Sequence, residues 1–88
     1  MDYKLLSFVK RSKRRVQILR ELSRPTIPTS IADAVGVSVS HVSRTLREFE
    51  EHGIAVCRTP EAKTGRIYEL TSKGRKILKT LGQRPSPV

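Results

Sequence analysis

Two amphipathic helix patterns separated by only three residues constrain the fold of this chain more than any other feature. The first begins at Pro28, which suits the first turn of a helix, and ends at Gly36, which supplies a left-handed C-cap. The second is expected over 39–52, with Ser38 as its N-cap. Ala32 is small enough for the two helices to cross closely, so the three residues between them form the tight turn of a helix-turn-helix.

Further elements flank this unit on both sides. Residues 2–22 carry a helical stripe of apolar side chains that Ser12 interrupts, which predicts a helix that can break at that serine. Residues 54–58 and 66–70 are rich in β-branched and aromatic side chains, and turn-forming residues separate them. They predict a β-hairpin. A last helix is expected to end near residue 81.

The order of these elements predicts a mainly α, α+β winged helix-turn-helix, with a three-helix core, a two-stranded β-wing and a C-terminal helix. Thr71 or Ser72 can cap the C-terminal helix. The length of 88 residues leaves no room for a second core, so residues 1–82 are expected to form a single domain. Residues 83–88, with two prolines, are expected to be a disordered tail.

The charge is large and unevenly distributed. The chain has 18 Lys and Arg against 8 Asp and Glu, a formal net charge of +10. Residues 1–24 and 54–88 each carry +6, whereas residues 25–53 carry −2. A surplus of this size favours a polyanionic partner. Basic flanks around a near-neutral centre favour a fold that contacts bases with its middle and phosphates with its flanks.

Several motifs carry a resemblance to a known family. They are SIADAVGVS at 30–38, VSRTLR at 42–47, EEHGI at 50–54, and the hairpin residues GR at 65–66 followed by LT at 70–71 and Gly74. Over residues 12–81 the chain resembles prokaryotic winged-helix transcription regulators of MarR and ArsR type and their small archaeal relatives. The resemblance implies that 39–52 is the recognition helix and the hairpin the wing. It also implies sequence-specific binding of double-stranded DNA in transcription regulation.

The chain departs from that family pattern in three respects. Its recognition helix has few basic residues, it lacks the long extra helices through which MarR proteins dimerise, and it lacks the Cys-rich metal site of ArsR sensors.

The recognition helix can also be interpreted residue by residue. If Val42, Leu46 and Phe49 face the core, the opposite side of the helix is exposed towards its N-terminal end. The candidate DNA-binding residues there are Ser38, Val39, Ser40, Ser43, Arg44 and Arg47. Either arginine can bind guanine O6 and N7 or touch phosphate alone, and both alternatives stay open.

Basic residues outside this helix are candidate phosphate contacts. In the wing they are Arg58, Lys63 and Arg66, and the polar Thr64 is a further candidate contact. Arg66 is the strongest candidate for a minor-groove or phosphate contact. In the first helical run they are Lys13, Arg14 and Arg15, which are equally consistent with a solvated face. The acidic residues Glu48, Glu50 and Glu51 are expected to point away from DNA, because they would repel phosphate.

Other classes of function receive little support. His41, His52 and Cys57 lack the paired short spacing of metal ligands, and the lone cysteine is expected to be a small buried hydrophobe. No nucleophile elbow or phosphate-binding glycine loop occurs, so no enzymatic activity, cofactor or small-molecule ligand is expected. No apolar run is long enough for a membrane span, and a cytoplasmic location is expected.

Two alternatives to DNA binding stay open. One is an RNA-binding or ribosome-associated basic protein, although four aromatic residues offer little surface for base stacking. The other is a winged helix that binds only other proteins. Competition between duplex DNA and structured RNA distinguishes the first alternative from DNA binding. A strong salt dependence of DNA binding counts against the second alternative.

The apolar residues near both ends predict a homodimer through the N- and C-terminal helices. Leu5, Phe8 and Val9 begin before the minimal three-helix core. At the other end of the chain, an apolar face is formed by Ile77, Leu78 and Leu81. Packing these faces against a twofold mate would bury both sets. In the alternative arrangement, both ends fold back on their own domain.

Overall fold

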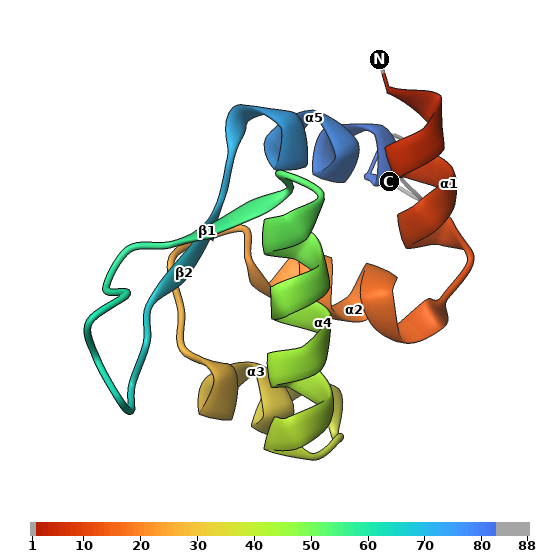
Figure 1. The fold of residues 1–88 in the computed structure, drawn as a ribbon. Coiled ribbons are helices and arrows are strands. Elements are labelled where there is room, and N and C mark those ends of the chain that lie inside the picture. Colours follow the sequence, from red (N-terminus) through yellow and green to blue (C-terminus); the bar gives the residue numbers. More distant parts are fainter. Residues whose placement is uncertain (1, 83–88) are drawn as a thin grey trace.

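The computed structural model describes residues 2–82, and Met1 and the expected tail at 83–88 lie outside this range. Helix α4 (Val39–Glu51) stands at the centre of the molecule (Figure 1). Helix α3 (Pro28–Val35) lies at its N-terminal end, and α1 (Tyr3–Lys10) and α5 (Ser72–Leu81) lie at its C-terminal end. The described chain is therefore mainly helical with one small sheet, which confirms the expected winged helix-turn-helix.

The N-terminal apolar stripe is divided between two helices rather than one. Helix α1 is capped by Asp2, whose carboxylate accepts hydrogen bonds from the backbone N–H groups of Lys4 and Leu5. Helix α2 (Lys13–Glu21) begins after Ser12, whose hydroxyl accepts from the backbone N–H of Arg15 at 3.2 Å. The break expected at Ser12 is confirmed, because its side chain satisfies an N–H that would otherwise lie unpaired at the start of α2.

The turn between α3 and α4 has the expected geometry. Gly36 adopts φ +81°, and its N–H donates to the carbonyl of Ala32 at 2.8 Å. Ser38 caps α4 by accepting from the N–H of His41 at 3.1 Å. Ala32 is 4% exposed. Both helix boundaries and the small residue at the crossing are thus where the sequence predicted them.

The wing is a short antiparallel pair of strands, β1 (Ala55–Cys57) and β2 (Tyr68–Leu70), with Ala55 opposite Leu70. Both strands are shorter than expected. The N–H of Ile67 donates to the Thr59 hydroxyl at 2.9 Å, so a side chain replaces the backbone acceptor where strand pairing would otherwise continue.

A bridge that the sequence analysis did not predict connects the wing to the rest of the fold. Thr26 and Tyr68 exchange two backbone hydrogen bonds, of 3.0 and 2.8 Å. Thr26 lies two residues before α3, so this bridge holds the wing beside the start of that helix.

Within residues 2–82, one core joins the five helices and the wing. Its largest fully buried side chains are Phe49, Ile18, Leu19, Leu22, Ile31, Leu46, Ile54, Ile77, Val9 and Val42. The terminal apolar residues belong to this same core: Leu5, Val9 and Ile77 are buried, and Phe8 and Leu78 are half-buried. A single chain thus hides most of the surface on which the homodimer prediction was based.

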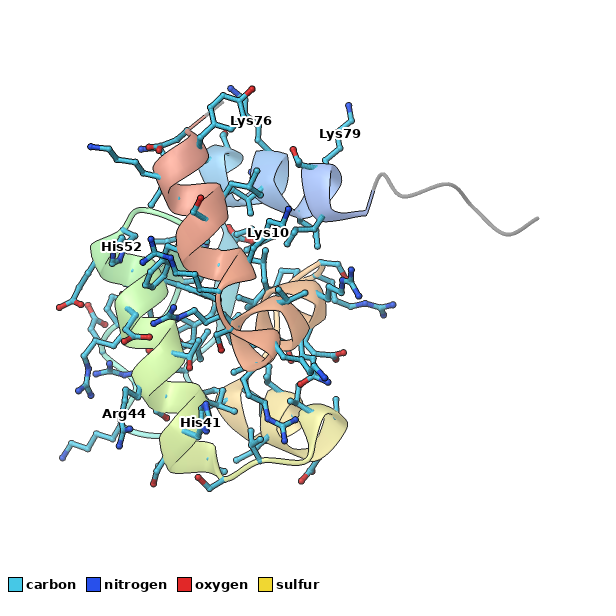
Figure 2. All side chains as sticks on the ribbon, turned by 90° about the vertical axis from the view of Figure 1, so that its right-hand side faces the viewer. Lys10, His41, Arg44, His52, Lys76 and Lys79 are labelled. Carbon is cyan, nitrogen blue, oxygen red and sulfur yellow. The ribbon has the colours of Figure 1, made fainter. Side chains whose placement is uncertain are left out.

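The outer faces of α1 and α5 are basic. Their exposed cations, counting the C-cap of α1, are Lys4, Lys10, Arg11, Lys73, Arg75, Lys76 and Lys79. Figure 2 shows Lys76 and Lys79 at the top of the molecule and Lys10 below them, whereas Arg44 lies near the lower end. Within residues 2–82, no helix is long and apolar enough to cross a membrane.

Candidate nucleic-acid interface

Helix α4 presents one face to the core and another to the surroundings. Val42, Leu46 and Phe49 are 0% exposed, as the spacing predicts. Thr45 is also buried, at 4%, and was not expected. The opposite face carries polar and charged side chains, so α4 can contact a partner along this face without disturbing the core.

The exposed face of α4 and the wing enclose a cleft of about 370 Å³. Helix α4 contributes one stripe of side chains to it, and the turn of the wing contributes another. The lining residues are Val39, Ser43, Arg47 and Glu50 from α4, Lys63, Thr64, Gly65 and Arg66 from the turn of the wing, Pro28 and Thr29 from α3, and Tyr68 from β2. The structure thus brings together predicted residues from two segments that are far apart in the sequence.

A second hollow, of about 340 Å³, adjoins the first along α4. It is lined by Val39, Ser40, Ser43, Arg44 and Arg47, all of which are predicted contact residues. Arg44 points outward from the N-terminal half of α4 (Figure 2). Ser38 lies just before this surface, where its hydroxyl is engaged in capping the helix.

The turn of the wing is fixed by its own backbone and side chains. Arg66 Nε donates to the carbonyl of Ala62 at 2.8 Å, and Gly65 adopts φ +66°. Lys63, Thr64 and Arg66 are exposed beside the cleft. Arg58 is placed differently from these three: its guanidinium pairs with the Glu69 carboxylate across the strands at 3.1 Å.

Arg15 is held within the fold, unlike its neighbours in the basic run. Its guanidinium lies 3.9 Å from the centre of the Phe8 ring, donates to the Phe8 carbonyl at 2.9 Å, and pairs with the Glu48 carboxylate at 3.7 Å. Lys13 and Arg14 are exposed. The basic run thus contains one half-buried structural arginine and two cations that face solvent.

The acidic residues of α4 do not share one orientation. Glu48 faces Arg15, away from the wing, as expected. Glu50, however, lines the cleft, so the prediction that all three glutamates point away was wrong for this residue. The reason is helical periodicity: Glu50 lies three residues after Arg47 and seven after Ser43, which places it on their stripe.

The histidines and the cysteine are dispersed. The His52 ring stacks on the Phe8 ring with centroids 4.2 Å apart, and His41 is exposed at the other end of α4 (Figure 2). Cys57 is half-buried rather than buried, because it ends β1 at the edge of the core. Among residues 2–82, no three His, Cys, Asp or Glu side chains are grouped as a metal site requires.

The cleft is electrostatically asymmetric. Arg47, Lys63 and Arg66 surround it, and Glu50 is the one acidic side chain among its described lining residues. Besides Glu50, sequence reasoning missed Pro28, Thr29 and Tyr68. These three are brought to the cleft by the bridge between Thr26 and the wing, for which the sequence offers no periodic signal.

Comparisons with known proteins agree with this geometry. Residues 4–84 match the family model described as the HVO_A0261 N-terminal domain. No curated protein matches the chain.

Three solved structures illustrate the likeness of fold. A MarR family transcriptional regulator from Silicibacter pomeroyi has a TM-score of 0.71 at 24% identity, over 89% of this chain and 54% of that one. The transcriptional repressor CouR, bound to a 23-mer DNA duplex, has a TM-score of 0.69 at 26% identity, over 90% and 58%. The adhesin competence repressor AdcR from Streptococcus pyogenes has a TM-score of 0.68 at 18% identity, over 90% and 65%.

The chain spans between about half and two thirds of the length of these solved regulators. Its fold is that of MarR-like winged-helix transcription regulators, and one solved protein of this fold is bound to a DNA duplex.

Proposed function

We propose that this chain, which belongs to the family of HVO_A0261 N-terminal domains, binds double-stranded DNA with sequence preference and regulates transcription. In this proposal residues 1–82 form one DNA-binding domain, α4 enters the major groove, and the wing contacts the neighbouring backbone or minor groove.

The observation that carries the proposal is the continuity of the two hollows along α4. They share Val39, Ser43 and Arg47, and the wing cations Lys63 and Arg66 border one of them. The candidate base-contacting side chains of α4 and the candidate phosphate-contacting cations of the wing therefore border one continuous surface, which supports sequence-specific DNA recognition. CouR, a protein of the same fold, was solved with a DNA duplex, which supports the same class of partner for this chain.

The proposed roles follow from the position of each side chain. Arg44 and Arg47 contact guanine O6 and N7 or the adjoining phosphates, Ser40 and Ser43 bond base edges, and Val39 meets a thymine methyl group. In the wing, Lys63, Thr64 and Arg66 contact the backbone or minor groove. Lys13 and Arg14 contact phosphate from the other side of α4. Arg15 and Arg58 support these residues through their pairs with Glu48 and Glu69.

A homodimer through α1 and α5 stays a prediction. Tyr3, 73% exposed on α1, is the apolar surface that supports it best. A twofold dimer would place two recognition helices about 34 Å apart and favour a pseudo-palindromic site. Sedimentation equilibrium at micromolar concentration tests this directly. A mass near that of the 9.9 kDa monomer, with one chain bound per DNA site, would exclude the dimer.

The proposed function is tested by selecting bound sequences from random duplex DNA. We expect a defined motif, with affinity for it at least about a thousandfold above that for random duplex. We also expect the logarithm of affinity to fall linearly with the logarithm of salt concentration. Stronger competition by structured RNA than by the selected duplex would instead favour the RNA-binding alternative, and an absence of binding to either would favour a protein-interaction module.

A further inference from the structure

Glu50 occupies a position at which a carboxylate is unfavourable for a surface that binds only phosphate. It lines the cleft on the same stripe as Arg47 and Ser43, and it is exposed. The two ion pairs among residues 2–82 join Arg15 to Glu48 and Arg58 to Glu69, so neither neutralises Glu50. If α4 enters a groove of DNA, this carboxylate enters with Arg47 and needs a hydrogen-bond donor there.

The major-groove edges of the bases offer that donor unequally. Guanine presents two acceptors, N7 and O6, and thymine presents the O4 acceptor and a methyl group. Adenine presents the N6 donor beside the N7 acceptor, which would repel a carboxylate. Cytosine presents the N4 amino group alone. A carboxylate that only accepts hydrogen bonds is therefore best satisfied by cytosine.

The position of Arg47 supports the same assignment. Residues three apart on a helix have Cβ atoms about 5 to 6 Å apart, and neighbouring base pairs are stacked about 3.4 Å apart. Arg47, which only donates hydrogen bonds, and Glu50, which only accepts them, can therefore contact adjacent base pairs with opposite chemical requirements.

We propose that Glu50 is a specificity-determining residue that accepts a hydrogen bond from cytosine N4 in the major groove. The assignment rests on the proposed DNA-binding function and deepens it. Its carboxylate also disfavours any docking that would place the C-terminal part of α4 against phosphate. Glu50 thus restricts both the bases and the register at which the chain binds.

The test compares three variants on one set of duplexes. The duplexes carry the selected motif with all four base pairs substituted in turn at each position. Glu50→Ala removes the acceptor, and Glu50→Gln replaces it with a group that prefers adenine N6 and N7. Glu51→Gln is the matched control, because it removes the same charge from the next residue, which is exposed but does not line the cleft. Thermal unfolding of each variant checks that the substitutions at these exposed positions leave the fold intact.

We expect Glu50→Ala to reduce discrimination at one C·G position by between about fivefold and about a hundredfold, with the other positions unchanged. Glu50→Gln is expected to shift the preference at that position towards adenine, and Glu51→Gln to leave every preference as it was. Equal changes in affinity on all duplexes would overturn the assignment of Glu50 but not the proposed function. The same pattern of base preferences for Glu50→Ala and Glu51→Gln would do so too. Absence of any preferred sequence for the unaltered chain would overturn both the assignment and the proposed function.

Discussion

Gly74 of α5 packs directly against the backbone carbonyl oxygen of Ile54, and a Cβ at position 74 would collide with that oxygen. The same Cβ would lie 3.1 Å from Leu70 Cδ2. The Ile54 carbonyl also accepts the N–H of Thr71 at 3.0 Å, so the start of α5 is held against the segment that leads into β1. This packing fixes where α5 leaves the wing.

Gly74→Ala should therefore destabilise the fold, although alanine is the better helix former by about 1 kcal/mol. We expect a net loss of about 1 to 3 kcal/mol in the free energy of unfolding, as is usual for overpacked sites. For a domain of this size, the melting temperature should fall by roughly 4 to 8 °C for each kcal/mol. Gly82→Ala is the control, because its φ of −84° and ordinary surroundings accept a methyl group. Equal melting temperatures for the two variants would contradict the packing described here.

Arg15→Gln should reduce stability rather than DNA affinity. It removes a cation over the Phe8 ring and a hydrogen bond to the Phe8 carbonyl, interactions that connect α2 to α1. We expect a decrease of about 1 to 3 kcal/mol in the free energy of unfolding, measured with urea. The exposed Lys13 provides the comparison: Lys13→Gln should leave the urea midpoint unchanged and reduce the salt slope of DNA binding by about 0.9 if it neutralises one phosphate. A stable Arg15→Gln variant with weakened DNA binding would reverse the assignment of this arginine.

The double variant Lys63→Gln/Arg66→Gln should weaken binding to every duplex by a similar factor. Both cations border the cleft on the wing and bind phosphate or the minor groove in the proposed complex. The slope of log affinity against log salt should become shallower by about 0.9 for each phosphate that the variant no longer neutralises. The matched control is Lys73→Gln/Lys76→Gln, which removes two exposed charges from α5. If the wing pair leaves the slope as it is, the wing does not touch DNA.

Arg44→Ala and Arg47→Ala separate base recognition from phosphate binding. If an arginine binds guanine O6 and N7, its replacement should reduce the binding free energy for the selected motif by about 1 to 3 kcal/mol and change binding to random duplex little. The preference at one base position should also relax. An arginine bound to phosphate alone should cost the same on both. Titration of each variant against the selected and random duplexes decides between the two for each residue.

The sequence predicted the helices best where a capping residue marks the boundary. Pro28 and Gly36 delimit α3 at the expected positions, and Ser38 begins α4 as its N-cap. Such signals are local, because a capping residue forms its hydrogen bond with a backbone group only three or four residues away in the sequence.

The elements that were missed depend on pairing between residues distant in the sequence. Thr26 and Tyr68 pair across more than forty residues, and Thr59 shortens the wing through its side chain. Neither leaves a periodic pattern. Glu50 is a different case, because helical spacing alone places it on the stripe of Arg47. Its charge led to the opposite expectation, on the assumption that the groove surface would exclude acidic residues.

The cations on the outer faces of α1 and α5 make ionic strength a variable with two opposite effects. A twofold dimer through these helices would bring like charges together, so added salt would screen their repulsion and favour association of the chains. The same salt would weaken the binding of each recognition surface to DNA. Occupancy of a palindromic site would then pass through a maximum at intermediate ionic strength, whereas occupancy of a single half-site would decline throughout.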